Sequence, residues 1–177
     1  MLARDHHRVL SEDDFLALPH SSEKLELVDG EVVVTPGPTW HHQTLAAGLY
    51  DTLRAWTRTV GPPWVVRFGP LDLRLAPGRI VQPDLLLLRE PPPLDHRGPL
   101  DLLPALVVEI TSSNADYDRL TKRLLYAEAG IGEYWVVDPA GGVEVFHGAG
   151  LRQRAWVTGL LVSPTLDGLV VEVDRLG

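Results

Sequence analysis

Two acidic residues lie where a charge is costly. Asp84 begins the apolar run 85–88, and Glu109 is the charged residue within the run 105–111. Burying an unpaired carboxylate costs several kcal/mol, so the two acids need a shared explanation. If these segments are neighbouring strands, the carboxylates can meet on one side of a sheet and hold Mg²⁺ or Mn²⁺. Such an ion activates water at a phosphoryl group, and Lys122 would neutralise further charge in the transition state.

Each of these residues also has an ordinary structural explanation. Asp84 follows Pro83 and suits a turn, and Glu109 suits a buried acid that pairs with an arginine. Lys122 comes four residues after Asp118, the spacing at which two such residues pair on a solvated helix face. A metal site therefore requires that all three residues come together in the fold.

Glu26 and His42 are further candidates for the same site. Glu26 stands between Leu25 and Leu27, so on a strand it faces away from both leucines. That places it either in solvent or in a site. His42 stands at the start of a long helix, where it would either cap the helix or contact a phosphate oxygen.

The first third of the chain predicts two helices and a hairpin. Ser11 and the acids after it are typical of a capped short helix. Alternating apolar residues over 24–34, interrupted at Asp29-Gly30, predict a β-hairpin with a two-residue turn. Leucines at spacings of three or four over 41–59 predict an amphipathic helix that packs on a sheet.

Two further strand-like runs and a long loop follow this helix. The runs cover 64–75 and 80–88, and the Pro77-Gly78 turn between them predicts a second hairpin. Residues 89–104 are rich in proline, and we expect them to form a semi-rigid loop over the sheet or at an edge of the site.

The last part of the chain predicts the centre of the sheet. The continuous apolar run 105–111 is typical of a strand covered on both faces. A helix capped by Ser113 and Asp116 then runs to about Ala129 and ends at Gly130. Further strand-like runs cover 133–138, 143–147, 155–157 and 169–173. The order of elements predicts an α/β (α+β) fold with a central mixed sheet flanked by helices, an N-terminal helix and hairpin, and a β-rich tail.

Composition limits the kinds of protein that this chain can be. Its 177 residues, 45% of them hydrophobic, predict one domain over 1–177 with a core at about 24–140. The absence of cysteine excludes disulfides, thiol nucleophiles and cysteine-bound zinc. The first residues lack the apolar run of a signal peptide, and no apolar stretch approaches the roughly 20 residues of a membrane span. We therefore expect a cytoplasmic protein.

The net charge of -8 counts against an extended surface for nucleic acid. A locally basic cleft or a bound divalent ion would overcome this objection. Three aromatic residues, Tyr126, Tyr134 and Trp135, accompany apolar runs, and we expect them in the core rather than stacked on bases.

An ordered set of motifs resembles the Uma-type family of restriction-endonuclease-like proteins. The motifs occur in order from about residue 11 to 140. They are Leu25-Glu26-Leu27-Val28-Asp29-Gly30-Glu31, His42-Gln43, Gln82-Pro83-Asp84, Val108-Glu109-Ile110-Thr111-Ser112, Asp118 with Lys122 and Tyr126, and Gly130-Ile131-Gly132-Glu133-Tyr134-Trp135-Val136-Val137-Asp138-Pro139.

The resemblance implies a PD-(D/E)xK nuclease core. Asp84 matches the aspartate of the first half-motif, and Glu109 matches the acid of the second. The lysine that usually follows two residues later is replaced by Thr111, and the resemblance points to Lys122 in its place. It also raises the expectation that Glu26 belongs to the site, whereas His42, although it stands in one of the matching motifs, is at a position where most histidines are structural.

The leading hypothesis is a Mg²⁺-dependent endonuclease that hydrolyses DNA, with Asp84 and Glu109 as metal ligands. Two alternatives stay open. One is a catalytically degenerate nuclease fold that binds a partner protein or nucleic acid, and the other is a hydrolase of another phosphodiester. By analogy with nucleases that cut both strands of a duplex, a homodimer is also expected.

Overall fold

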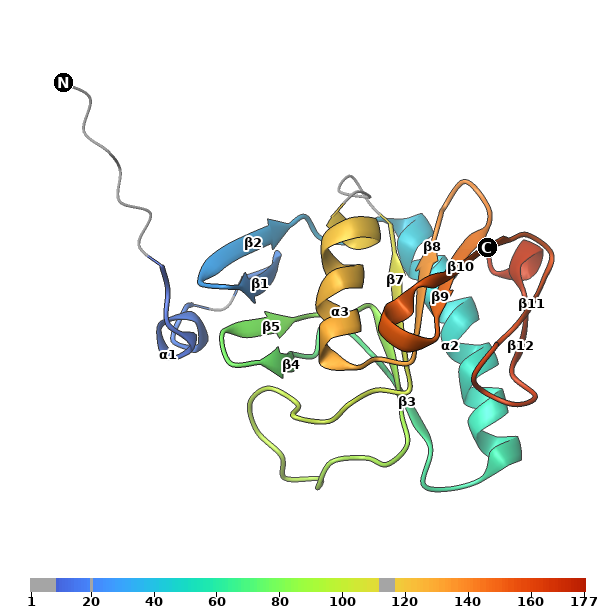
Figure 1. The fold of residues 1–177 in the computed structure, drawn as a ribbon, viewed down its shortest axis with the longest axis horizontal. Helices are drawn as coiled ribbons and strands as arrows, with labels where there is room; N and C mark the ends of the chain where they lie inside the picture. The colour runs from blue at the N-terminus through green and yellow to red at the C-terminus, as the bar shows by residue number, and fades with distance from the viewer. Residues whose placement is uncertain (1–8, 20, 112–116) are drawn as a thin grey trace.

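A six-stranded mixed sheet forms the centre of the molecule, for which a computed structural model describes residues 9–19, 21–111 and 117–177 (Figure 1). Its strands run in the order β10-β9-β8-β7-β6-β3. They are β3 (Val65–Phe68), β6 (Leu85–Leu88), β7 (Leu106–Ile110), β8 (Glu133–Val137), β9 (Val143–His147) and β10 (Gln153–Val157). β7 and β8 are parallel, and the other neighbouring pairs are antiparallel. The predicted central mixed sheet is confirmed.

Helices cover both faces of this sheet. One face packs against α2 (Trp40–Val60), and the other against the π-helical turn η1 (Tyr117–Lys122) and α3 (Arg123–Ala129). Successive strand residues point to opposite faces, so Val108 packs in the core cluster of α2 and Val107 in that of α3. The predicted amphipathic helix is confirmed. The predicted cap at residues 113 and 116 lies outside the described residues.

A second, four-stranded sheet lies beside the first, with strands in the order β2-β1-β5-β4. It consists of β1 (Lys24–Val28), β2 (Glu31–Thr35), β4 (Leu73–Ala76) and β5 (Arg79–Val81). β1 and β2 form the predicted first hairpin. Its turn residues Asp29 and Gly30 have φ of 52° and 88°, the positive values that a primed turn requires.

The predicted second hairpin is only partly right. Run 64–75 is broken at Pro70 into β3 and β4, and run 80–88 is broken at Pro83 into β5 and β6. β4 and β5 pair in the small sheet, whereas β3 and β6 pair in the large one. Proline lacks an amide hydrogen and cannot continue the ladder, so each run crosses between the sheets there. Asp84 directly follows one of these crossings.

The ends of the chain add small elements at the periphery. The predicted N-terminal helix is α1 (Glu12–Leu16), and Ser11 and Asp14 form its capping box. The tail adds η2 (Ala149–Leu151), β11 (Leu160–Val162), β12 (Val170–Glu172) and η3 (Val173–Arg175). β11 was not predicted; it pairs with β12 beside α2 (Figure 1). Within the described ranges, no helix is long and apolar enough to cross a membrane.

Two arginines fix the small sheet to its surroundings. Arg74 of β4 lies 2.6 Å from Glu12 of α1 and 2.6 Å from Asp101 of the proline-rich loop. Arg79 of β5 pairs with Asp29 of the hairpin turn and also with α3. Each arginine joins segments far apart in the sequence, so the small sheet is held against the helical layer.

A substitution at Gly69 tests how closely the chain is packed at the crossing next to Asp84. A Cβ at Gly69 would lie 2.5 Å from the carbonyl oxygen of Pro83, a contact that backbone must move to relieve. We expect Gly69→Ala to lower the free energy of unfolding by about 1–3 kcal/mol, measured by urea unfolding. Gly132→Ala is the matched control, because its Cβ would meet no atom within 4 Å. Equal stability of the two variants would contradict this view of the crossing.

Candidate active site

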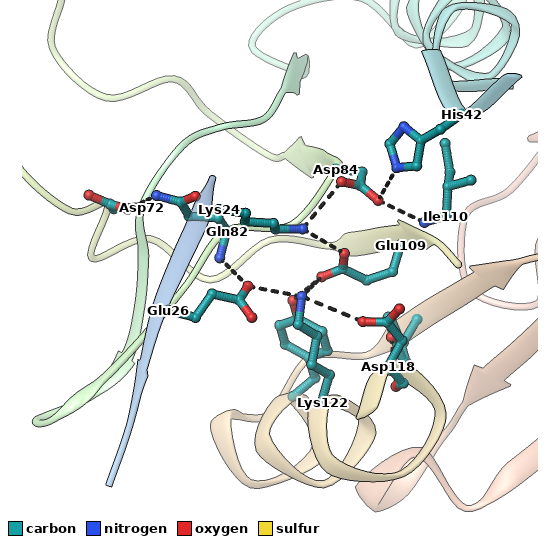
Figure 2. A network of polar contacts seen from close by, with 12 residues as sticks. Lys24, Glu26, His42, Asp72, Gln82, Asp84, Glu109, Ile110, Asp118 and Lys122 are labelled. Carbon is teal, nitrogen blue, oxygen red and sulfur yellow. Dashed lines mark hydrogen bonds and ion pairs between the residues drawn. The ribbon is translucent and has the colours of Figure 1, made fainter. Parts of the chain in front are cut away.

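A cleft of about 620 Å³ opens where the small sheet meets the C-terminal end of β7. Its walls come from β1, the start of α2, the segment before β6, and η1. The charged and imidazole side chains at its base are those of Lys24, His42, Asp84, Glu109, Asp118 and Lys122 (Figure 2). Segments distant in the sequence therefore deliver ionisable groups to one place.

Asp84 and Glu109 converge on a single cationic point. β6 and β7 pair with Leu85 opposite Val108, and this register continues to place Asp84 beside Glu109. Asp84 Oδ1 and Glu109 Oε2 both lie 3.2 Å from the ammonium nitrogen of Lys24. The two acids thus meet at one edge of the sheet, as their positions in the sequence indicate. Their role as metal ligands stays a prediction.

The second oxygen of Asp84 is held by two donors. Oδ2 accepts a hydrogen bond from the amide of Ile110 at 2.8 Å and lies 3.1 Å from His42 Nε2. Burial raises the pKa of Asp84, but His42, Lys24 and the Ile110 amide outweigh it and hold the pKa well below its usual range. The α2 cap is Thr39. The ring of His42 therefore orients Asp84 instead of capping the helix.

Glu109 is held from the opposite side by the helical layer. Its Oε1 accepts hydrogen bonds from Lys122 Nζ and from the Tyr126 hydroxyl, each at 2.8 Å. The Lys122 side chain is only 2% exposed, so the solvated-face explanation is wrong, although Asp118 does lie 3.7 Å away. Tyr126 packs in the core as expected, but its hydroxyl belongs to the site.

Glu26 belongs to the interior. Its side chain is buried, and Oε1 lies 2.9 Å from Lys122 Nζ and accepts a hydrogen bond from the Gln82 amide. The solvent-facing alternative for Glu26 is therefore wrong. The other oxygen, Oε2, is buried without a hydrogen bond of standard geometry in the described part of the chain. The buried hydroxyl of Tyr117 interacts with the Glu26 carboxylate, so this side of Glu26 also faces a polar group.

Lys122 carries its charge despite complete burial. Loss of hydration lowers the pKa of its ammonium, but Glu109, Glu26 and Asp118 outweigh this effect and raise the pKa well above its usual value. Thr111, the residue at the usual lysine position, instead donates its hydroxyl to the Val137 carbonyl. A lysine from the following helix thus reaches Glu109, as the resemblance implied.

Lys24 is the residue of this site that sequence reasoning missed. Two signals were present. Lys24 and Glu26 are two apart on one strand and share a face. In addition, the chain has 16 Lys and Arg residues, of which only two are lysines, Lys24 and Lys122. Both line the cleft. Lysine offers a compact ammonium on a flexible four-carbon stem.

Buried acids elsewhere in the sheet are satisfied in a different way. Glu133 accepts hydrogen bonds from Trp135 and from Ser163 of the tail. Glu144 pairs with the guanidinium groups of Arg119 and Arg154. Neither acid lines the cleft. The arginine pairing that would have explained Glu109 as a structural residue is thus found at Glu144, whereas Glu109 pairs with the two lysines.

The donor set suits a hard divalent cation. Among the described residues, no group of three or more His, Asp or Glu side chains is arranged to hold a metal. Mg²⁺ typically uses one or two carboxylates and keeps several waters. Two carboxylates, those of Asp84 and Glu109, already converge on a bound ammonium. The residues present therefore fit such an ion.

The comparisons agree with this fold. The mixed sheet and its helical layers define a restriction-endonuclease-like fold. The profile of the Uma2 family, described as "putative restriction endonuclease", matches residues 12–173, so the chain belongs to that family. Its fold is similar to that of a crystal structure described as "a putative nuclease belonging to DUF820" from Anabaena variabilis. The TM-score is 0.77 at 18% identity, over 94% of this chain and 97% of that one. No curated protein matches the chain.

Lys122→Met is expected to destabilise the fold. It leaves Glu26 and Glu109 buried without their shared partner, which costs about 3–5 kcal/mol of unfolding free energy. Adding Glu109→Gln to Lys122→Met should recover part of this loss, although Glu109→Gln alone destabilises the wild type. Urea unfolding of the four proteins measures the coupling. Additive losses would contradict a shared ion network.

The raised pKa of Asp118 makes the free energy of unfolding depend on pH. Burial, with the charge of Glu109, raises its pKa from 3.8 to about 7 against the opposing effect of Lys122. Between these values the native state keeps a proton that the unfolded chain has released, so Asp118 lowers stability as pH rises. We expect the stability of Asp118→Asn to rise relative to that of the wild type as pH increases from about 4 to about 7, measured by urea unfolding.

Asp51→Asn is the matched control for this experiment, because Asp51 is exposed on α2. The control should follow the pH dependence of the wild type. A stability difference between Asp118→Asn and the wild type that does not change with pH would contradict the raised pKa.

Proposed function

We propose that this protein is a Mg²⁺-dependent nuclease that hydrolyses phosphodiester bonds of DNA. One observation carries the proposal: the carboxylates of Asp84 and Glu109 converge on one cationic point inside a cleft. Membership of a family described as putative restriction endonucleases supports the nuclease part of it. Asp84 and Glu109 would hold the ion.

The chemistry required is addition of water to phosphorus and loss of the ester oxygen. The water oxygen bonds to phosphorus, the P–O ester bond breaks, and a proton passes to the leaving oxygen. A bound divalent ion supplies activation of water and neutralises charge on the phosphoryl oxygens. The protein must then hold two carboxylates ionised and aligned beside the substrate.

The remaining side chains serve that alignment. His42 and the Ile110 amide fix Asp84 in its ionised form. Lys122 is buried between Glu26 and Glu109, so it orients Glu109 and is a positioning residue in this account. This refines the charge-stabilising role that the sequence predicts for Lys122, because a side chain that is only 2% exposed has little surface open to a substrate in the cleft.

The cleft also supports a second candidate, hydrolysis of a smaller phosphodiester. None of the arginines in the described part of the chain lines the cleft, whereas Glu23 and Asp72 do. Binding of a long duplex relies on many Lys and Arg contacts to phosphates. A short or single-stranded substrate needs fewer of them. The homodimer expected from the sequence stays a prediction, which sedimentation would test.

Asp84→Ala tests the proposed function. In calorimetric titration with Mg²⁺ or Mn²⁺, we expect the variant to lose the binding that the wild type shows, because one of two carboxylate ligands is gone. Plasmid nicking on the same samples should be lost with it. Asp95→Ala, which removes an exposed acid of the proline-rich loop, is the control and should keep both.

Three outcomes decide between the candidates. Binding without nicking, together with hydrolysis of a small phosphodiester such as a dinucleotide, would favour the second candidate. Wild-type binding that survives Asp84→Ala would contradict the site. Absence of both binding and hydrolysis in the wild type would leave the fold as a binding module.

A further inference from the structure

Lys24 occupies the point on which the two acids converge. Its Nζ lies 3.2 Å from both Asp84 Oδ1 and Glu109 Oε2 (Figure 2). We propose that the Lys24 ammonium competes with the metal ion for the oxygens of Asp84 and Glu109. When the ion binds, the ammonium is displaced into the cleft, where it pairs with the substrate phosphate. This inference rests on the proposed function and adds a residue to its site.

The competition follows from shared ligands. An ammonium ion and a divalent cation cannot occupy the same point, and each needs the same oxygens of Asp84 and Glu109. Their positive charges repel strongly at contact distance in a partly buried site. Metal binding must therefore break both ion pairs of Lys24, and the affinity measured for the metal includes that cost.

The two lysines of the chain differ in their freedom to move. Lys122 is 2% exposed and holds Glu26 as well as Glu109, so it keeps a partner if one contact is lost. Lys24 is 19% exposed, begins β1, and lines the cleft. Its flexible four-carbon stem allows the ammonium to leave the acids and remain in the cleft.

The displaced ammonium supplies what the cleft otherwise lacks. No arginine from the described ranges lines the cleft, and Lys122 is already bound. A phosphate oxygen near the acids would therefore find Lys24 as its mobile cationic partner, and a phosphate is a ligand that an ammonium binds well. Lys24 thus opposes metal binding and favours substrate binding, two effects of opposite sign.

Lys24→Met separates these effects. We expect calorimetric titration to show Mg²⁺ or Mn²⁺ bound about tenfold more tightly than by the wild type, which corresponds to about 1.4 kcal/mol. In saturating Mg²⁺, a short phosphorothioate oligodeoxynucleotide should bind about tenfold more weakly by fluorescence anisotropy. Lys24→Arg keeps the charge and should not gain metal affinity. Arg97→Met, in the exposed proline-rich loop, should change neither affinity.

A second measurement uses the wild type and does not depend on a variant that folds. Because the chain has only two lysines, acetylation of each is read unambiguously by peptide mass spectrometry. Mg²⁺ should increase the acetylation of Lys24 severalfold, since its ammonium leaves the acids, and leave buried Lys122 unchanged as an internal reference. In Asp84→Ala, Mg²⁺ should have no effect on Lys24.

The results separate this inference from the function on which it rests. If the wild type binds metal through Asp84, but Lys24→Met binds it no more tightly and Mg²⁺ does not expose Lys24, the competitor role is overturned and the nuclease proposal stands. If neither protein binds metal, the proposed function fails and the inference fails with it. Tighter metal binding with weaker oligonucleotide binding would support both.

Discussion

The structure depends on keeping a group of buried charges paired where its two sheets meet. Lys122 joins Glu26 of the small sheet to Glu109 of the large sheet, and Lys24 joins Glu109 to Asp84. Burial of any one of these charges without its partner would cost several kcal/mol. The crossings between the sheets and the helix that carries Lys122 are therefore constrained by electrostatics as well as by apolar packing.

The parts of this arrangement that follow from local patterns were predictable. The leucine periodicity predicts α2, the Asp29-Gly30 pair predicts the hairpin turn, and the apolar run predicts β7. Each of these patterns lies within one continuous segment of the chain. The pairing of Asp84 with Glu109 was predictable for a different reason. Carboxylates in apolar runs need a compensating partner, and two of them on adjacent strands indicate a shared one.

The parts that were missed depend on contacts between distant segments. Periodicity shows that Lys24 and Glu26 share a face of β1, but not that this face meets the edge of another sheet. It likewise placed Tyr126 in the core without indicating that its hydroxyl reaches Glu109. The split of the second hairpin at two prolines has the same origin, because each half pairs in a different sheet.

We propose that Asp84 and Glu109 hold an exchangeable cation. Anomalous diffraction from crystals of the wild type grown with Mn²⁺ tests this proposal most directly. We expect one anomalous peak between the two carboxylates, with the Lys24 ammonium moved away from both. Crystals in which Lys24 still bridges Asp84 and Glu109, with no peak at the acids under conditions that support hydrolysis, would contradict it.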